Sequence, residues 1–468
     1  MELVNFVLCF LFVGSVWCGS EYYMASVVDA DKGDLIRSNK YATLINEAAQ
    51  SNVDLLVLPT PKTATLEYTL ESCGLENLDE VVKSVSAAAK LAHMYVVAPL
   101  YEKVNCQDKE ELITNNLVFD RAGSLIYVHR RPVNSLTRCN TTSSRIGRFV
   151  TDFGVTFGVL VEEDLLLTNA QEFEGIENFV ITDNSVSKKS FIFAQQFQAS
   201  WAFVKKVNVI SASGYISGTD GLKRTSPLIV AKLRKSGGAQ SSFIAGPPSS
   251  FPSEDLNQYV IKPVNLEASL QGYSDSVCHG RFCCQFFVKT SVIGTNPQDV
   301  SYGLVAFDGI HQSGSNNIGV QTCSLVACAG LYKRSCFVGS EKNTTNINFD
   351  KISIVANFSK ANSAQFPTIS TTTQTVCNEE NFKFTIKSTD YNYVTTEIHN
   401  TDNILIFGII GRDYSKDFES TNYNSTEDNI LDFSEYISSE NVQEFFDYVW
   451  IKLRVVILIV SVYILEMM

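Results

Sequence analysis

The sequence predicts an α/β layered domain followed by a second domain that is mainly β, and three observations support this. Over the first two hundred residues, short apolar runs alternate with segments in which apolar residues recur at helical spacing. Residues 55–58 are continuously apolar and end at Pro59, as expected for a strand buried on both faces. A stretch rich in Gly, Ser and Pro, 235–252, separates this part from a region of closely spaced strand-like runs.

The first part is expected to alternate strands and helices, as in an α/β layer fold. Tyr41, Leu44, Ile45 and Ala48 fall on one face of a helix, and the turn 121–124 joins two strands as a hairpin. The expected strands are 24–28, 55–58, 94–100, 116–120, 125–128, 155–161, 179–182 and 207–212, and the further expected helices are 78–92 and 194–205.

The second part is expected to consist mainly of strands. These are 286–292, 302–307, 319–325, 352–358, 382–386 and 404–410. A Ser- and Thr-rich stretch, 368–375, is expected to interrupt the strands before the last two.

The charge of the chain and its N-terminus point to secretion rather than to nucleic acid. A formal net charge of -13 argues against a nucleic-acid ligand and against an electrostatic membrane-surface site. Residues 4–17 are almost wholly apolar and precede three small residues, which predicts a secretory signal peptide at 1–20. This run is too short for a membrane anchor.

The C-terminal region, 413–468, combines an acidic run with an apolar end. The acidic residues gather between Asp413 and Asp447, and this run is expected to be solvated. The final apolar stretch, 455–465, predicts a cleaved tail for a GPI anchor, with Ser438 and Ser439 as candidate attachment sites. A short amphipathic terminal segment is the alternative.

Cysteines and glycosylation sequons agree with an extracellular location, either secreted or attached to the outer cell surface by a GPI anchor. Removal of the signal peptide leaves ten cysteines, an even number that could pair in an oxidising compartment, with a zinc site as the alternative. The disulfide candidates are Cys73, Cys106, Cys139, Cys278, Cys283, Cys284, Cys323, Cys328, Cys336 and Cys377. The sequons Asn-x-Ser/Thr begin at Asn140, Asn343, Asn357 and Asn424.

A cysteine-rich segment carries a family resemblance. Residues 277–284 read Val-Cys-His-Gly-Arg-Phe-Cys-Cys, and Tyr-Gly-Leu at 302–304 and Ala-Phe-Asp-Gly-Ile-His at 306–311 follow. With Ser-Trp-Ala at 200–202 and the run 207–213, this combination resembles the vanin and biotinidase branch of the nitrilase, or carbon-nitrogen hydrolase, superfamily. The similarity extends from about residue 22 to about residue 413. It implies a nitrilase-type αββα sandwich over 21–245 and a β-rich, disulfide-containing domain over 253–412.

The resemblance also locates the residues that should carry chemistry. Amidases of this type use a cysteine nucleophile, a glutamate general base and a lysine that stabilises the oxyanion. The matching positions hold Glu162 in place of the cysteine, Thr60 in place of the glutamate and Arg130 in place of the lysine. A further family glutamate falls at Gln196. No cysteine occurs between Cys139 and Cys278, so no shift of the match within that region supplies a nucleophile.

These replacements predict an ion pair where the catalytic residues would have been. We expect Arg130 to pair with Glu162, and Thr60 to donate a hydrogen bond to the pair. The alternative is that Arg130 turns outward and that Glu162 pairs with another base. The five histidines show no metal-ligand spacing, so neither a metal nor a cofactor is expected.

The sequence therefore favours an extracellular pseudoenzyme that binds a small molecule or an extracellular protein through the retained scaffold. An active amidase of the pantetheinase or biotinidase type, in which another group replaces the thiol, is the main alternative. A purely adhesive or structural surface glycoprotein is the third possibility.

Overall fold

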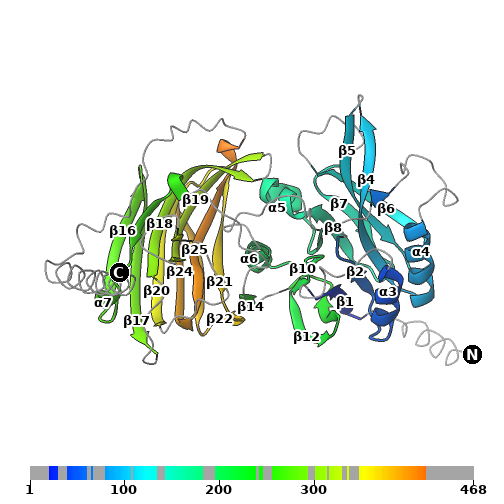
Figure 1. Cartoon of the computed structure of the whole chain (residues 1–468), viewed down its shortest axis with the longest axis horizontal. Helices are drawn as coiled ribbons and strands as arrows, with labels where there is room; N and C mark the ends of the chain where they lie inside the picture. The colour runs from blue at the N-terminus through cyan, green and yellow to red at the C-terminus, as the bar shows by residue number, and fades with distance from the viewer. Residues whose placement is uncertain are drawn as a thin grey trace, which may run out of the picture.

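A computed structural model shows two β-rich sandwiches arranged along the long axis of the molecule (Figure 1). The structure describes residues 20–29, 40–60, 65–66, 80–106, 109–133, 143–182, 195–238, 242–245, 256–293, 301–313, 316–328, 335–336 and 347–417. The expected signal peptide, acidic run and apolar tail, Cys73 and Cys139, and the sequons at Asn140, Asn343 and Asn424 lie outside these residues. No helix of the described part is long and apolar enough to span a membrane.

The first domain contains two sheets that face each other. Sheet 1 has the order β12-β13-β1-β2-β4-β5-β6, with β3 beside β4, and sheet 2 has the order β11-β10-β9-β8-β7. The strands of sheet 1 are β1 (Tyr22–Val28), β2 (Leu55–Val57), β3 (Thr65–Leu66), β4 (Tyr95–Cys106), β5 (Lys109–Phe119), β6 (Leu125–Pro132), β12 (Thr219–Thr225) and β13 (Leu228–Arg234). Those of sheet 2 are β7 (Gly147–Val150), β8 (Thr156–Val161), β9 (Asn178–Thr182), β10 (Asn208–Ser211) and β11 (Tyr215–Ser217).

The centre of each sheet is parallel, as the continuous apolar runs predicted. Strands β1, β2 and β4 pair in parallel in sheet 1, and β8, β9 and β10 do so in sheet 2. Successive side chains of a strand point to opposite faces. On β1, Ala25 and Val27 therefore enter the core between the two sheets, whereas Val28 packs against the helices outside sheet 1.

Helices cover both outer faces, which confirms the αββα sandwich. Helices α3 (Tyr41–Ala49) and α4 (Glu80–Ala92) share a hydrophobic core with sheet 1. Helices α5 (Glu162–Leu167) and α6 (Gln195–Lys205) pack on sheet 2. The short helix η3 (Ala170–Phe173) follows α5 in the chain.

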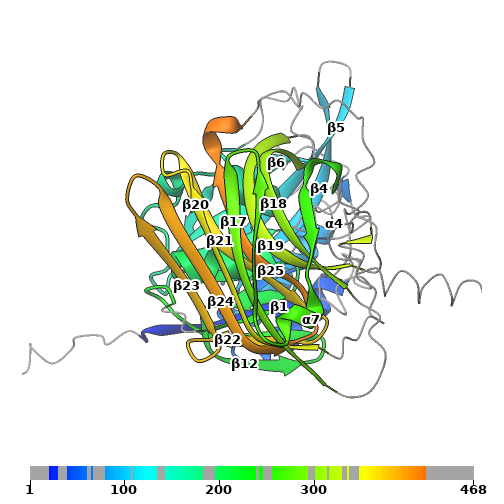
Figure 2. The same ribbon diagram turned by 90° about the vertical axis from the view of Figure 1, so that its left-hand side faces the viewer.

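The second domain is a sandwich of two antiparallel sheets. Sheet 3 has the order β15-β18-β19-β25-β21 and sheet 4 the order β16-β17-β20-β24-β23, seen from its outer side in Figure 2. The strands are β15 (Val260–Pro263), β16 (Tyr273–His279), β17 (Phe282–Val292), β18 (Ser301–Ser313), β19 (Asn316–Cys328), β20 (Ile347–Phe358), β21 (Ser363–Thr371), β23 (Phe382–Ser388), β24 (Asn392–Asp402) and β25 (Ile404–Asp413). The short helices η5 (Leu256–Gln258), α7 (Leu266–Ser269) and η7 (Tyr414–Lys416) accompany them.

Two expectations about this region need correction. Part of the stretch 368–375, expected as an interruption, belongs to β21, where Thr368 and Ser370 are buried and pair with β25. Threonine fits a strand well, so its polarity misled the assignment. Strand β14 (Ser242–Ala245) fell within the range assigned to the first domain, but it pairs with β22 (Thr375–Asn378) of the second. Its residues Phe243 and Ala245 belong to the core of the second sandwich.

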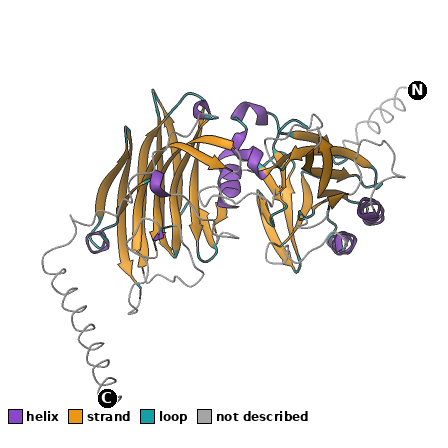
Figure 3. Cartoon of the chain, turned by 45° about the horizontal axis from the view of Figure 1, so that its top comes forward, coloured by secondary structure: helices purple, strands orange, loops and turns teal. Residues whose placement is uncertain are grey.

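The helix layer formed by α5 and α6 lies between the two sandwiches (Figures 1 and 3). One hydrophobic core contains Trp201 of α6, Phe179 of sheet 2 and Val320 of sheet 3. The ring of Phe197 lies 5.2 Å from that of Phe366 in β21, measured between centroids. The same helix layer therefore closes both domains, and the molecule has the layer order α-β-β-α-β-β.

Arg412, near the end of β25, links the second domain to α5. Its side chain is fully buried, and its Nε donates to the carbonyl oxygen of Leu166 at 2.9 Å. Its Nη1 donates to the carbonyl of Gly319, and its Nη2 donates to both carboxylate oxygens of Asp417 at 2.8 and 2.9 Å. Tyr414 adds a hydrogen bond to the carbonyl of Thr168, just beyond α5.

Removing the negative charge at Asp417 should destabilise the protein. Asp417→Asn leaves the buried Arg412 guanidinium without its counter-charge, and breaking a buried pair in this way costs about 3 kcal/mol or more. A lower midpoint of thermal unfolding, measured by calorimetry, is the expected result. Asp390→Asn, at an exposed carboxylate, is the matched control. Equal midpoints for the two variants would contradict the assignment.

Candidate functional site

The four positions that the resemblance assigns to chemistry lie in four different elements. Thr60 follows β2 and is half-buried, and Glu162 is the first residue of α5, directly after β8. Arg130 lies in β6, and Gln196 lies in the first turn of α6. Glu162 and Gln196 are both buried. The segments after β2 and β8 both leave the carboxyl ends of parallel strands, where α/β sheets commonly place functional groups.

The pairing of β5 with β6 decides which way the basic residues of β6 point. Asn115 lies opposite Arg130 in this ladder, and Asn116 lies opposite His129. Residues directly opposite in a ladder share a face, and their neighbours point the other way. Asn115 and Arg130 therefore share one face of sheet 1, while His129 and Arg131 lie on the other.

On the first face, Arg130 binds a carboxylate from β4. Its Nη2 donates to Oε2 of Glu102 at 2.8 Å, and Nδ2 of Asn115 donates to the same oxygen at 2.7 Å. Glu102 is fully buried, so the guanidinium supplies the counter-charge that a buried carboxylate requires. The predicted pair between Arg130 and Glu162 is therefore wrong. Strand alternation turns Arg130 to the face of Asn115, where Glu102 is its partner.

On the opposite face, Arg131 binds the segment that follows β8. Its Nε donates to Oδ2 of Asp164 at 2.6 Å, and its Nη2 donates to Oδ1 at 2.7 Å. Its Nη1 donates to the carbonyl oxygen of Ser143 at 2.8 Å. Burial raises the pKa of Asp164, and the hydrogen bonds from Arg131 oppose that shift. The salt bridge with the segment after β8 thus exists, but each partner differs from the predicted one.

The sequence contained a signal for this pairing. Val128 is apolar and packs on the helix side of sheet 1, so alternation from that residue assigns Arg130 to the helix side and Arg131 to the inter-sheet side. The sequence interpretation matched residues to family positions and did not use this alternation. It also missed Asp164, which lies two residues beyond Glu162 in the same short helix.

The middle acidic residue of this segment contacts the second domain. Nδ2 of Asn316, in β19, donates to Oε1 of Glu163 at 2.9 Å. Burial raises the pKa of Glu163, while the hydrogen bond from Asn316 lowers it. Glu163 and Asp164 thus connect α5 to the second domain and to sheet 1, respectively.

His129 is a structural residue in this environment. Its Nε2 donates to the carbonyl oxygen of Ser144 at 2.8 Å, while Nδ2 of Asn116 donates to its Nδ1 at 3.3 Å. These two contacts fix the neutral ring with its proton on Nε2. Burial lowers the pKa of His129 to about 4. A ring held neutral and fully used in hydrogen bonds is not available as a general acid near neutral pH.

Six described cysteines form disulfides, and the zinc alternative is therefore not supported. The bridges are Cys278–Cys283, Cys284–Cys323 and Cys328–Cys336. Cys377 was expected to pair but is a buried free thiol, because the other six described cysteine side chains pair with one another. Burial raises the pKa of Cys377 to about 12. The side chain of Cys106 is outside the described part. No group of three or more His, Cys, Asp or Glu residues among the described ones could hold a metal ion.

The buried neutral state of His129 predicts a pH dependence of stability. The folded-state pKa of about 4 lies below the ordinary histidine pKa of 6.5, so the unfolded chain binds more protons between these values. Stability is therefore complete above pH 6.5 and falls as the pH decreases toward 4. Between pH 7 and pH 5 the wild-type protein should lose about 2 kcal/mol more than His129→Gln, which cannot titrate. Denaturant unfolding at both pH values checks this, and parallel losses would contradict it.

Comparison with known proteins finds relatives along most of the chain. Residues 250–417 match the family described as the Vanin C-terminal domain. The chain is 24% identical to Vanin-like protein 1 of Drosophila melanogaster, with 85% of this chain and 87% of the relative covered. It is 26% identical to Vanin-like protein 3 of the same organism, over 69% of this chain and 74% of the relative.

Among solved structures, Nit3 of Saccharomyces cerevisiae, a member of branch 10 of the nitrilase superfamily, is similar to the chain with 14% identity and a TM-score of 0.32. The similarity covers 46% of this chain and 91% of Nit3. The second domain thus matches the Vanin C-terminal domain family, and most of the chain is similar to Vanin-like proteins.

Proposed function

We propose that this chain is an extracellular vanin-like pseudoenzyme, which does not hydrolyse amides and acts by binding a small molecule or a protein. One observation carries the proposal: the segment after β8 contains Glu162, Glu163 and Asp164 and no cysteine. Nitrilase-type hydrolysis requires a thiolate that holds the acyl group as a thioester. A carboxylate at this position cannot form that intermediate.

The basic residues support the proposal, because both are already engaged. An oxyanion site needs donors that point at the position where charge develops. Arg131 directs three donors at Asp164 and at the carbonyl of Ser143, and Arg130 binds Glu102. A tetrahedral intermediate would compete with buried carboxylates for both guanidinium groups. This geometry favours a structural role for the two arginines.

Buried polar atoms in the middle of β5, beside the strand that carries Arg130 and Arg131, support binding of a polar molecule. Oγ1 of Thr114, Oδ1 of Asn115 and Oδ1 of Asn116 are buried and have no hydrogen-bond partner among the described residues. Asn115 lies on the helix side of the sheet, and Thr114 and Asn116 lie on the other side. Buried groups of this kind in native proteins generally bond to ordered water or to a ligand. These three oxygen atoms of β5 could therefore accept hydrogen bonds from water or from a bound polar molecule.

Three disulfides in the described part support an extracellular location, since structural bridges persist mainly in oxidising compartments. The predicted signal peptide and sequons agree with it. Attachment through a GPI anchor is the more specific part of this proposal, and it rests on the apolar end of the sequence.

An activity assay tests the proposal directly. The purified secreted protein should hydrolyse neither pantetheine nor a biotinyl amide faster than a heat-denatured sample. It should also not trap labelled substrate as a thioester. Glu162→Ala is the matched control, because any background hydrolysis that does not involve this site should be equal in the variant and the wild-type protein. Turnover in the wild-type protein that is lost in Glu162→Ala would show an active amidase. Ligand-induced thermal stabilisation would favour binding over a purely adhesive or structural role.

Glycosylation of Asn357 tests the extracellular location within the described part. Asn357 lies in β20, opposite Tyr393, and its side chain is exposed on the outer face of sheet 4. A glycan here would project into solvent without disturbing the core. Asn357→Gln should remove one glycan from the secreted protein, seen as a faster gel mobility that disappears after enzymatic deglycosylation. Identical mobility of the wild-type protein and the variant before deglycosylation would contradict this expectation.

A further inference from the structure

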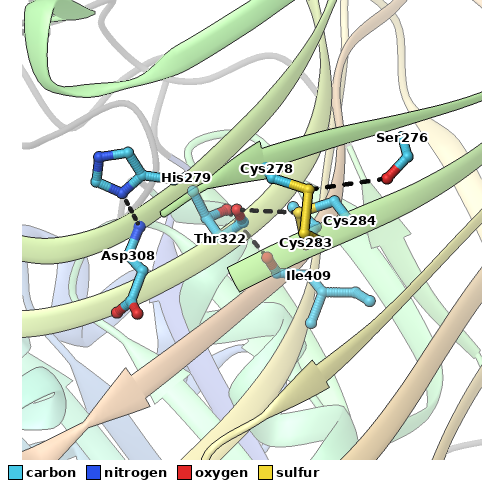
Figure 4. Close-up of a disulfide and its surroundings, with 9 residues drawn as sticks. Ser276, Cys278, His279, Cys283, Cys284, Asp308, Thr322 and Ile409 are labelled. Carbon is cyan, nitrogen blue, oxygen red and sulfur yellow. Dashed lines mark hydrogen bonds between the residues drawn. A yellow bond between two sulfur atoms is a disulfide. The ribbon is translucent and has the colours of Figure 1, made fainter. Parts of the chain in front are cut away.

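The hairpin of β16 and β17 carries a disulfide on the solvent side of sheet 4. Cys278 and Cys283 lie directly opposite each other in the ladder, with their Cα atoms 4.0 Å apart, and both are exposed. Figure 4 shows the bridge together with Ser276 and His279. Cys284, the next residue, points to the opposite face and is fully buried. Adjacent cysteines on one strand thus belong to bridges in two different environments.

The other two described bridges are closed to solvent. Cys284 and Cys323 connect sheet 4 to sheet 3 inside the core, and both are fully buried. Cys328 and Cys336 are also buried. Thiol–disulfide exchange requires a thiolate to reach a disulfide sulfur atom, so access decides which bridge reacts. In the described part, only Cys278–Cys283 satisfies this condition.

The hairpin does not depend on this bridge for its shape. All seven residues of β16 pair with β17, and β17 continues into a long ladder with β20. The tip is also held by His279, whose Nδ1 accepts a hydrogen bond from the backbone N–H of Asp308 at 2.9 Å and whose ring stacks on Phe307. A bridge between residues five positions apart closes a short loop, and short loops contribute least to stability.

We propose that Cys278–Cys283 is a thiol-exchange site, at which an extracellular small-molecule thiol becomes attached to Cys283. The incoming thiolate attacks Sγ of Cys283, the bond between the two protein sulfurs breaks, and Cys278 leaves as a thiolate that takes a proton from water. A second thiol can then attack the mixed disulfide. It releases the small-molecule disulfide and leaves two reduced cysteines, so that two thiols are oxidised for each bridge reduced.

Ser276 determines which sulfur is attacked. Its Oγ lies 4.0 Å from Sγ of Cys278, and because a disulfide sulfur has no hydrogen, the hydroxyl is the donor. Ser276 lies two residues before Cys278 and shares its outward face. The hydroxyl can therefore stabilise negative charge on Cys278 as the bond breaks, and no described residue makes a corresponding contact to Cys283. This makes Cys278 the better leaving group and Cys283 the site of attachment.

The proposal is tested on the full-length secreted protein with reduced glutathione as the probe. After a graded time in native buffer, free thiols are blocked with an alkylating agent and mapped by peptide mass spectrometry. Cys278 and Cys283 should be labelled at least about tenfold faster than the buried cysteines of the other two bridges, Cys284, Cys323, Cys328 and Cys336. The buried cysteines become accessible only when the protein unfolds locally. The trapped glutathione should be on Cys283. Labelling of all six cysteines together would overturn the proposal, and glutathione found mainly on Cys278 would overturn the assigned direction.

Two variants separate this chemistry from a structural effect. Ser276→Ala should slow the exchange about threefold through loss of one hydrogen bond. Ser274→Ala, at the preceding outward position of β16, should leave the rate unchanged. Cys278→Ser with Cys283→Ser should be secreted with a thermal midpoint close to that of the wild-type protein and should lose the fast labelling. If this double variant is not secreted, the claim that the hairpin stands without its bridge is wrong.

Discussion

The burial of α6 between two sandwiches is the constraint on which the rest of the structure depends. A helix on the outside of an α/β sandwich normally has one apolar face and one solvated face. Here Trp201 and Phe197 are both buried, the first against sheet 2 and the second against β21. One helix layer contributes to a core that both domains share, so each sandwich buries part of its apolar surface against this layer. The position of α5, and with it the segment after β8, follows from this arrangement.

Polar contacts then fix α5 to both domains. Asp164 binds Arg131 of sheet 1, Glu163 binds Asn316 of β19, and the carbonyl of Leu166 accepts a hydrogen bond from Arg412. In a nitrilase-type amidase, the segment at this place in the fold must present a reactive thiol to the substrate. In this chain, the corresponding segment joins the two domains. The acidic residues of this short helix thus have structural partners in both domains, which is consistent with the proposed pseudoenzyme.

The sequence predicted elements well where burial dictates the residue pattern. Strand β2 is continuously apolar, β8 and β9 are mainly apolar and almost wholly buried, and α3 shows its buried face at helical spacing. Prediction failed where the pattern is weak. Strand β12 reads Thr-Asp-Gly-Leu-Lys-Arg-Thr because an edge strand has little core to cover. The partner of Arg130 depends on which face of β6 it occupies, a property that matching family positions does not provide.

Strand β14 lies within the sequence range expected for the first domain but pairs with β22 of the second. This arrangement affects where the chain can be cut to produce the second domain alone. Phe243 of this strand packs against Phe382, with ring centroids 5.3 Å apart, and pairs in register with Cys377. A fragment cut at the apparent linker after residue 245 would remove that cover and expose the ring of Phe382 and the thiol of Cys377 to water. Any attempt to produce the second sandwich by itself must therefore begin before Ser242, and it would still lack the helix layer on which sheet 3 rests.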